Sequence, residues 1–128
     1  MITELITYFT VLPKHCNHHL PMVFGGEFMA QMDIAAAMLV SKTLADSETA
    51  TYAVTHKFSC EFSKAAQMGD IIELQCKIVE LREKAIIVEV KAMRSKRGSK
   101  VSDQVASAKA VFVAKNGEDY VKHGLRLI

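Results

Sequence analysis

The stretch FGGEFMAQMDIAAAMLV, residues 24–40, decides the fold because it predicts a helix that is apolar on nearly every side. Phe28, Met32 and Leu39 recur at helical spacing, and alanine, isoleucine and methionine cover most of the remaining surface. The helix is expected to begin near residue 25 and to end near residue 45, where turn-forming residues follow. Such a helix must be buried on nearly all sides, which favours a sheet curled around it.

One strand-like segment precedes the helix and four follow it. They cover residues 2–12, 51–62, 70–81, 85–93 and 103–115. Alternation in the second segment predicts one shared face for a set of side chains, namely Val54, His56, Phe58, Cys60 and Phe62. Alternation in the third segment predicts another shared face, formed by Ile72, Leu74, Cys76 and Ile78. Consecutive strands joined by short turns predict an antiparallel sheet.

The sequence therefore predicts a single domain over residues 1–128, of the α+β class, in which a curved antiparallel sheet of about five strands surrounds one long buried helix. One small sheet cannot enclose a helix completely. A second copy of the chain is expected to close the open side, so burial alone predicts a dimer. Cover by the chain's own loops is the alternative.

Composition excludes several classes of function. The chain has 128 residues, half of them hydrophobic, and a formal charge of +2 that is too small to indicate nucleic acid. No apolar run approaches the roughly 20 residues of a membrane span, and the N-terminus lacks the pattern of a secretory signal. Three widely spaced cysteines, without a CxxC pair, favour reduced thiols and a cytoplasmic location.

Asp33 places an ionisable carboxylate inside this apolar helix. An ionised carboxylate without partners costs several kcal/mol to bury, so it is either paired structurally or used chemically. It lies two helical turns beyond Gly25 and Gly26, where the free amides of a helix start bind oxyanions and glycine lets a ligand approach closely. A carboxylate and free amides near an apolar pocket are the parts needed to hydrolyse an acyl group.

Two stretches resemble the hotdog-fold acyl-CoA thioesterases, in particular the acyl-CoA hydrolase branch. The stretch VFGGEFMAQMD, residues 23–33, is similar to the helix-start motif of that family through Phe24, Gly25, Gly26, Phe28, Met29, Met32 and Asp33. The stretch FSKAAQMGDIIEL is similar to a second motif through Phe62, Gly69 and Asp70. The resemblance implies the hotdog fold, thioester hydrolysis without metal or organic cofactor, and a dimer, often assembled into a tetramer or hexamer, with the active site at its interface.

Residue roles follow from the same resemblance. Asp33 is implied as general base or nucleophile, and the Gly26 amide as part of the oxyanion hole. The family's asparagine before the helix corresponds to His18 in direct register, with Asn17 one residue earlier, so both are catalytic candidates. The helix face and its start are implied to line the acyl tunnel, through Phe24, Gly25 and Met29.

The sequence indicates the carrier of the acyl group less directly than it indicates thioester hydrolysis. The family's Gly-x-Ser-Ser turn, which contacts coenzyme A, is replaced here by LREKAII. Arg82 and Lys84 in that turn are candidates for binding phosphate. The basic stretch MRSKRGSK, residues 93–100, is an equivalent candidate, or else a solvated hairpin tip.

Two rival functions remain. His19 lies 14 residues before Asp33, and hotdog dehydratases that act on 3-hydroxyacyl thioesters use a similar pair of histidine and carboxylate. Alternatively, a non-catalytic module could hold zinc or copper on the stretch KHCNHH, through His15, Cys16, His18 and His19, although its spacing matches no common zinc site. His56 is expected to be a core or interface histidine.

Overall fold

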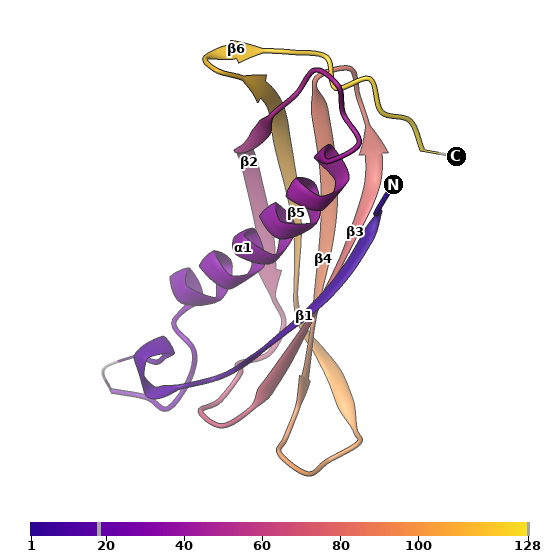
Figure 1. Ribbon diagram of the computed structural model, residues 1–128. Helices are drawn as coiled ribbons and strands as arrows, with labels where there is room; N and C mark the ends of the chain where they lie inside the picture. The colour runs from indigo at the N-terminus through magenta and orange to yellow at the C-terminus, as the bar shows by residue number, and fades with distance from the viewer. Residues whose placement is uncertain (18, 128) are drawn as a thin grey trace.

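The computed structural model, shown in Figure 1, describes residues 1–17 and 19–127. The elements follow in the order β1 (Glu4–Thr10), the short 3-10 helix η1 (Pro13–His15), α1 (Gly25–Leu44), β2 (Tyr52–Phe62), β3 (Ile71–Leu81), β4 (Ala85–Ser95), β5 (Ser102–Asn116) and β6 (Asp119–Tyr120). One strand, one helix and a run of strands were expected, and this order is confirmed.

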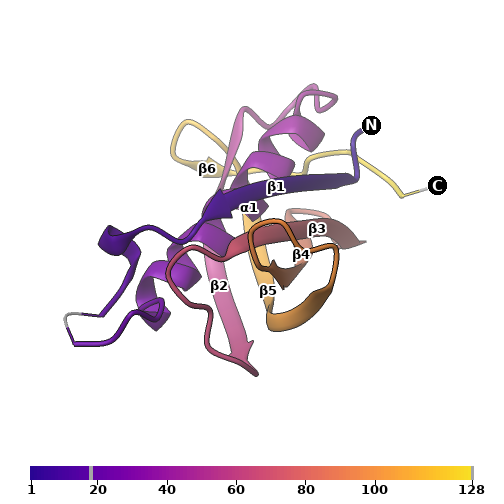
Figure 2. The same cartoon turned by 90° about the horizontal axis from the view of Figure 1, so that it is seen from below.

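The sheet has the strand order β1-β3-β4-β5-β2, and β6 pairs with β5. Every pairing is antiparallel, as expected. Figure 2 shows the strands following an arc around α1. The structure therefore confirms a curved sheet wrapped around one helix, which is the hotdog arrangement.

The core lies between the concave face of the sheet and one side of α1. Phe28, Met32 and Leu39 are almost completely buried on the helix, and the predicted inward set of β3 is buried throughout. Each such apolar side chain contributes about 1.5–3 kcal/mol when removed from water. The helix is less enclosed than its sequence predicts, because Ile34 and Met38 keep 53% and 43% of their surfaces exposed. A single chain thus leaves one side of α1 open.

A β-bulge at His56 interrupts β2. Thr55 pairs with Phe112 and Lys57 pairs with Val111, so His56 is the extra residue. The prediction that Val54 and His56 share a face with Phe58 is therefore wrong, because strict alternation fails at the bulge. Thr55 faces the helix instead of Val54, and His56 is exposed rather than part of the core.

The two ends of the sheet carry different features. At the end where α1 begins, here called the start end, the Val23 amide donates to the Ala66 carbonyl and the Arg94 guanidinium donates to the Ala65 carbonyl. At the opposite end, here called the tail end, the C-terminal segment crosses the β3–β4 turn, and the His123 amide donates to the Glu83 carbonyl. Figure 1 shows both termini at the tail end. Among the described residues, no helix is long and apolar enough to cross a membrane.

Burial of Cys76 predicts a loss of stability in alkali. Removal from water raises the pKa of this thiol from 9.0 to about 11. Between these values the unfolded chain loses a proton that the folded chain retains, so the free energy of unfolding should fall as pH rises from about 9 to about 11. Urea unfolding across this range should give a shallower fall for Cys76→Ala than for the wild type. Cys16→Ala removes a loop thiol as a control, and parallel curves for wild type and Cys76→Ala would contradict the prediction.

Candidate active site

The first turn of α1 is held by backbone contacts rather than by a capping side chain. Phe24 occupies the N-cap without a side-chain hydrogen bond, and its amide donates to the His15 carbonyl at 2.8 Å. The first amides of a helix have no intrahelical partner, so those of Gly25 and Gly26 can serve a ligand. A Cβ on Gly26 would lie 2.9 Å from the Phe24 ring. Glycine at this position therefore lets the Phe24 ring rest against the helix start.

Asp33 is paired with a residue that sequence reasoning missed. The Thr55 hydroxyl donates a hydrogen bond to Asp33 Oδ1 at 2.9 Å, and Asp33 is half-buried. This contact orients the carboxylate while leaving its second oxygen for other chemistry. No signal in the sequence marks Thr55, because regular alternation along β2 would turn it away from the helix. Only the bulge at His56 brings it inward.

Gly26, Met29 and Asp33 share one side of α1. Their spacing of three and four residues places them in a row, and at 1.5 Å per residue Gly26 and Asp33 lie about 10 Å apart along the axis. Met29 lies between them and is 37% exposed. The predicted catalytic carboxylate, the predicted oxyanion amide and one predicted acyl contact are thus on the open side of the helix.

Two hollows flank the start of α1. One, of about 330 Å³, is lined by Gly25, Phe28 and Phe62 together with the 63–66 loop. The Phe28 and Phe62 rings meet edge to face at 5.8 Å and form its apolar wall. The other hollow, of about 400 Å³, contains Asn17, Phe24, Cys16, Lys14 and Glu27. Gly25 thus lines the first hollow, whereas Asn17 lines the second together with Phe24.

The remaining predicted residues lie elsewhere or are not described. His18 lies outside the described residues. Arg82 and Lys84 occupy the β3–β4 turn at the tail end, so one chain does not bring them to Gly26 or Asp33. The Arg82 guanidinium also forms an ion pair with Glu80. A role for these two cations would require a second copy of the chain.

A three-membered ion cluster stands beside the Phe62 hollow. Lys64, from the loop lining that hollow, and Arg94, from β4, both contact Asp103 of β5, at 2.9 and 2.8 Å. The pKa of Asp103 is lowered by its hydrogen bond from Lys64 and then by that from Arg94. Arg94 also donates to the Ala65 carbonyl at 2.7 Å, so the cluster ties the β4–β5 hairpin to the loop lining the hollow.

The motif around Gly69 and Asp70 is structural within one chain. Gly69 has a φ of 90°, which glycine adopts without strain, and the Asp70 carboxylate accepts the Gln67 amide at 2.9 Å. These contacts close the turn between β2 and β3. Asp70 is buried and has this local partner, so the second stretch of resemblance fixes the loop beside the Phe62 hollow.

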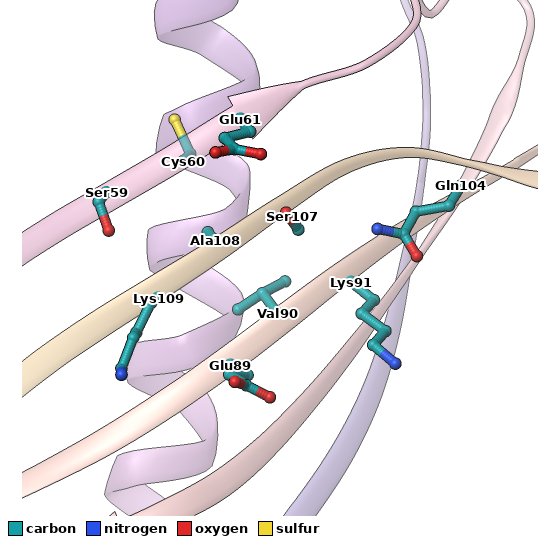
Figure 3. A pocket seen from close by; sticks show the side chains of 10 residues that line it. All are labelled: Ser59, Cys60, Glu61, Glu89, Val90, Lys91, Gln104, Ser107, Ala108 and Lys109. Carbon is teal, nitrogen blue, oxygen red and sulfur yellow. The ribbon is translucent and has the colours of Figure 1, made fainter.

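A hollow of about 510 Å³ lies on the convex face, away from the predicted site. Figure 3 shows its side chains on β2, β4 and β5, with α1 behind the strands. Glu61, Glu89, Lys91 and Lys109 surround it with both signs of charge, and it contains none of the predicted site residues. We assign it no part in the chemistry at Asp33.

The geometry gives little support to the two rival functions, a metal-binding module and a dehydratase. Among the described residues, which omit His18, no three histidine, cysteine, aspartate or glutamate side chains form a group that could hold a metal ion. His15 is buried, and its Nδ1 accepts the Leu12 amide at 3.0 Å, which is a structural role. His19 is exposed in the loop before α1, and its pairing with Asp33 in a dehydratase stays an untested prediction.

Both a family model and a related sequence connect this chain with thioester hydrolases. A model of the thioesterase superfamily matches residues 20–101. A protein of Buchnera aphidicola subsp. Acyrthosiphon pisum, described as an uncharacterized acyl-CoA thioester hydrolase, is 30% identical over 92 residues, 71% of this chain. That match spans 65% of the relative, slightly less than two thirds of its length.

Solved structures show the same fold. The acyl-CoA hydrolase of Staphylococcus aureus, in complex with butyryl coenzyme A, coenzyme A and coenzyme A disulfide, is 26% identical with a TM-score of 0.84, covering 95% of this chain and 71% of that one. A hexameric acyl-CoA thioesterase without ligand is 24% identical with a TM-score of 0.82, covering 95% of this chain and 75% of that one. With the family model matching well over half of its length, the chain belongs to the thioesterase superfamily.

Proposed function

We propose that this protein hydrolyses acyl-CoA thioesters to the free acid and coenzyme A. The observation that carries the proposal is the Asp33 carboxylate, oriented by Thr55 on the same side of α1 as the free amides of the helix start. Membership of the thioesterase superfamily and the coenzyme A bound by the S. aureus relative support it.

The chemistry needs only groups present in the chain. The Gly26 amide donates to the thioester carbonyl oxygen and stabilises the negative charge that develops there. Asp33 either takes a proton from the attacking water or attacks the carbonyl carbon itself. Collapse of the intermediate breaks the carbon–sulfur bond, and the thiolate leaves and takes up a proton. Where Asp33 is the nucleophile, this step leaves an acyl–aspartate anhydride, which water then hydrolyses to release the free acid and restore the carboxylate. Both routes use the same carboxylate.

A second copy of the chain completes this site. Within one helix, about 10 Å along the axis separates Gly26 from Asp33, which is long for two groups that act on one carbonyl. Pairing the open sides of two helices places the helix start of one chain opposite Asp33 of the other. Ile34 and Met38, one helical turn apart, form the exposed apolar surface for this pairing, here called the open stripe. A dimer, alone or within a larger assembly, is therefore part of the proposal.

The test is thiol release from a panel of acyl-CoAs with short, medium, long and aromatic acyl groups. We expect turnover of at least part of the panel, with a preference that reports the size of the apolar hollow beside Phe28 and Phe62. Release from no acyl-CoA, together with formation of an enoyl product from a 3-hydroxyacyl thioester, would contradict the proposal and favour the dehydratase. Metal analysis of protein purified without a histidine tag tests the rival metal-binding function.

A further inference from the structure

Two basic turns were equivalent candidates for binding phosphate, and the structure distinguishes them. The β3–β4 turn with Arg82 and Lys84 lies at the tail end, whereas the β4–β5 turn lies at the start end, as Figure 1 shows. Its three exposed cations, Lys96, Arg97 and Lys100, are here called the hairpin tip. The hairpin tip is thus at the same end of the sheet as the start of α1 and the Phe62 hollow.

The hairpin tip carries uncompensated positive charge. Among the described residues, the ion pairs include none from Lys96, Arg97 or Lys100. The neighbouring acid, Asp103, is already held by Lys64 and Arg94. Arg82 at the other turn is instead occupied by Glu80. Lys84 of the β3–β4 turn also has no ion pair among the described residues, so the hairpin tip is favoured by its place at the start end together with its three cations.

The backbone of the hairpin tip is ordered by its own contacts. Gly98 has a φ of 79°, and the Ser99 amide donates to the Lys96 carbonyl at 2.9 Å. At its base, Arg94 joins Asp103 of β5 and the Ala65 carbonyl of the loop that lines the Phe62 hollow. These contacts hold the base of the turn against the loop that lines that hollow, while the charged side chains of the tip are exposed.

We propose that the hairpin tip binds the phosphate groups of coenzyme A, and this inference rests on the proposed function. The pantetheine arm is long and uncharged, so it separates the thioester from the phosphates and can follow the hollow between Phe62 and the 63–66 loop. Arginine binds phosphate in a bidentate manner and lysine as a point charge. The tip supplies both at the far end of that path.

The test compares the triple variant Lys96→Ala/Arg97→Ala/Lys100→Ala with the wild type on two substrates carrying the same acyl group. On acyl-CoA, KM should rise roughly tenfold, about twofold for each exposed cation, with kcat unchanged. On the acyl-pantetheine, which has no phosphate, both constants should stay the same. Added salt should raise the wild-type KM for acyl-CoA and affect the variant less.

A matched variant controls for net charge. Lys77→Ala/Lys122→Ala/Arg126→Ala removes three exposed cations away from the start end and should leave both substrates unaffected. An equal rise in KM for this variant, an effect of the tip variant on both substrates, or a loss that follows Arg82→Ala/Lys84→Ala instead would overturn the inference. So would a tip effect confined to an acyl group on acyl carrier protein, because the tip would then bind a protein carrier.

Calorimetry separates this inference from the proposed function. Binding of coenzyme A requires no turnover, and the tip variant should bind it roughly tenfold more weakly. Dephospho-coenzyme A shows whether the 3′-phosphate is among the groups bound. Hydrolysis of both thioesters with unchanged coenzyme A binding by the tip variant would defeat the inference alone. Coenzyme A binding that depends on the tip, without hydrolysis of either thioester, would defeat only the proposed function.

Discussion

Asp33→Asn should lower kcat for acyl-CoA hydrolysis by about two to four orders of magnitude, the usual contribution of a positioned acid or base. Asparagine keeps the shape of the side chain and an oxygen that accepts the Thr55 hydroxyl, but it carries no negative charge. It can neither deprotonate water effectively nor attack the carbonyl. Thiol release under saturating substrate measures the loss, and circular dichroism of both proteins shows whether the fold persists.

Two further variants separate a catalytic aspartate from a structural one. Thr55→Val removes the hydroxyl that orients Asp33 and should lower kcat by roughly tenfold, less than loss of the carboxylate itself. Asp46→Asn makes the same chemical change just beyond the end of α1 and should retain full activity. If Asp33→Asn instead melts well below the wild type and loses activity only in proportion to unfolding, Asp33 is structural and the proposed mechanism is wrong.

Ile34→Glu should separate the assembly into single chains of 14.2 kDa and reduce activity per chain by tenfold or more. Ile34 is half exposed in one chain, so glutamate there costs the isolated fold little. In the open stripe of a dimer, the same carboxylate would be buried without a partner at a cost of several kcal/mol. Light scattering during size-exclusion chromatography measures the mass, and the thiol assay measures the activity.

The chain offers a close control for this change. Ile6 lies on β1, away from the helix, and is 54% exposed against 53% for Ile34. Ile6→Glu should leave both mass and activity unchanged. Dissociation by Ile6→Glu and not by Ile34→Glu would place the interface on the convex face of the sheet. An active single chain in the Ile34→Glu variant would show that one copy is sufficient for catalysis.

The sequence predicted the elements well because their signals are local. A helix from about 25 to 45 was expected and α1 runs from Gly25 to Leu44, since its apolar pattern and first glycines are contiguous in the chain. The alternation of β3 was also correct, because no bulge interrupts the stretch from Ile72 to Ile78. The strand order β1-β3-β4-β5-β2 was not predicted, as it depends on pairings between distant segments.

The sequence brought candidate site residues together only where they share one element. Gly26 and Asp33 lie on one helix, so their spacing alone placed them on one side. Thr55 was missed because its direction depends on the bulge at His56. The sequence also could not show which basic turn lies near the start of α1. The two turns flank β4 and lie at opposite ends of the sheet, and the position of α1 relative to those ends comes from the structure. Such information belongs to tertiary structure and not to any short motif.

The bulge at His56 also affects how this protein should be compared with its relatives. Side chains that face the helix fall at odd-numbered positions of β2 before the bulge and at even-numbered positions after it. Thr55 and Phe58 therefore share a face although three positions separate them. A relative without the extra residue would have to be aligned with a gap at this position, or every assignment on one side of it would be shifted. Deleting His56 here should restore regular alternation along β2 and leave Thr55 paired with Phe112 and directed at Asp33. The bulge thus absorbs one additional residue in an edge strand while the contact between Thr55 and Asp33 is kept.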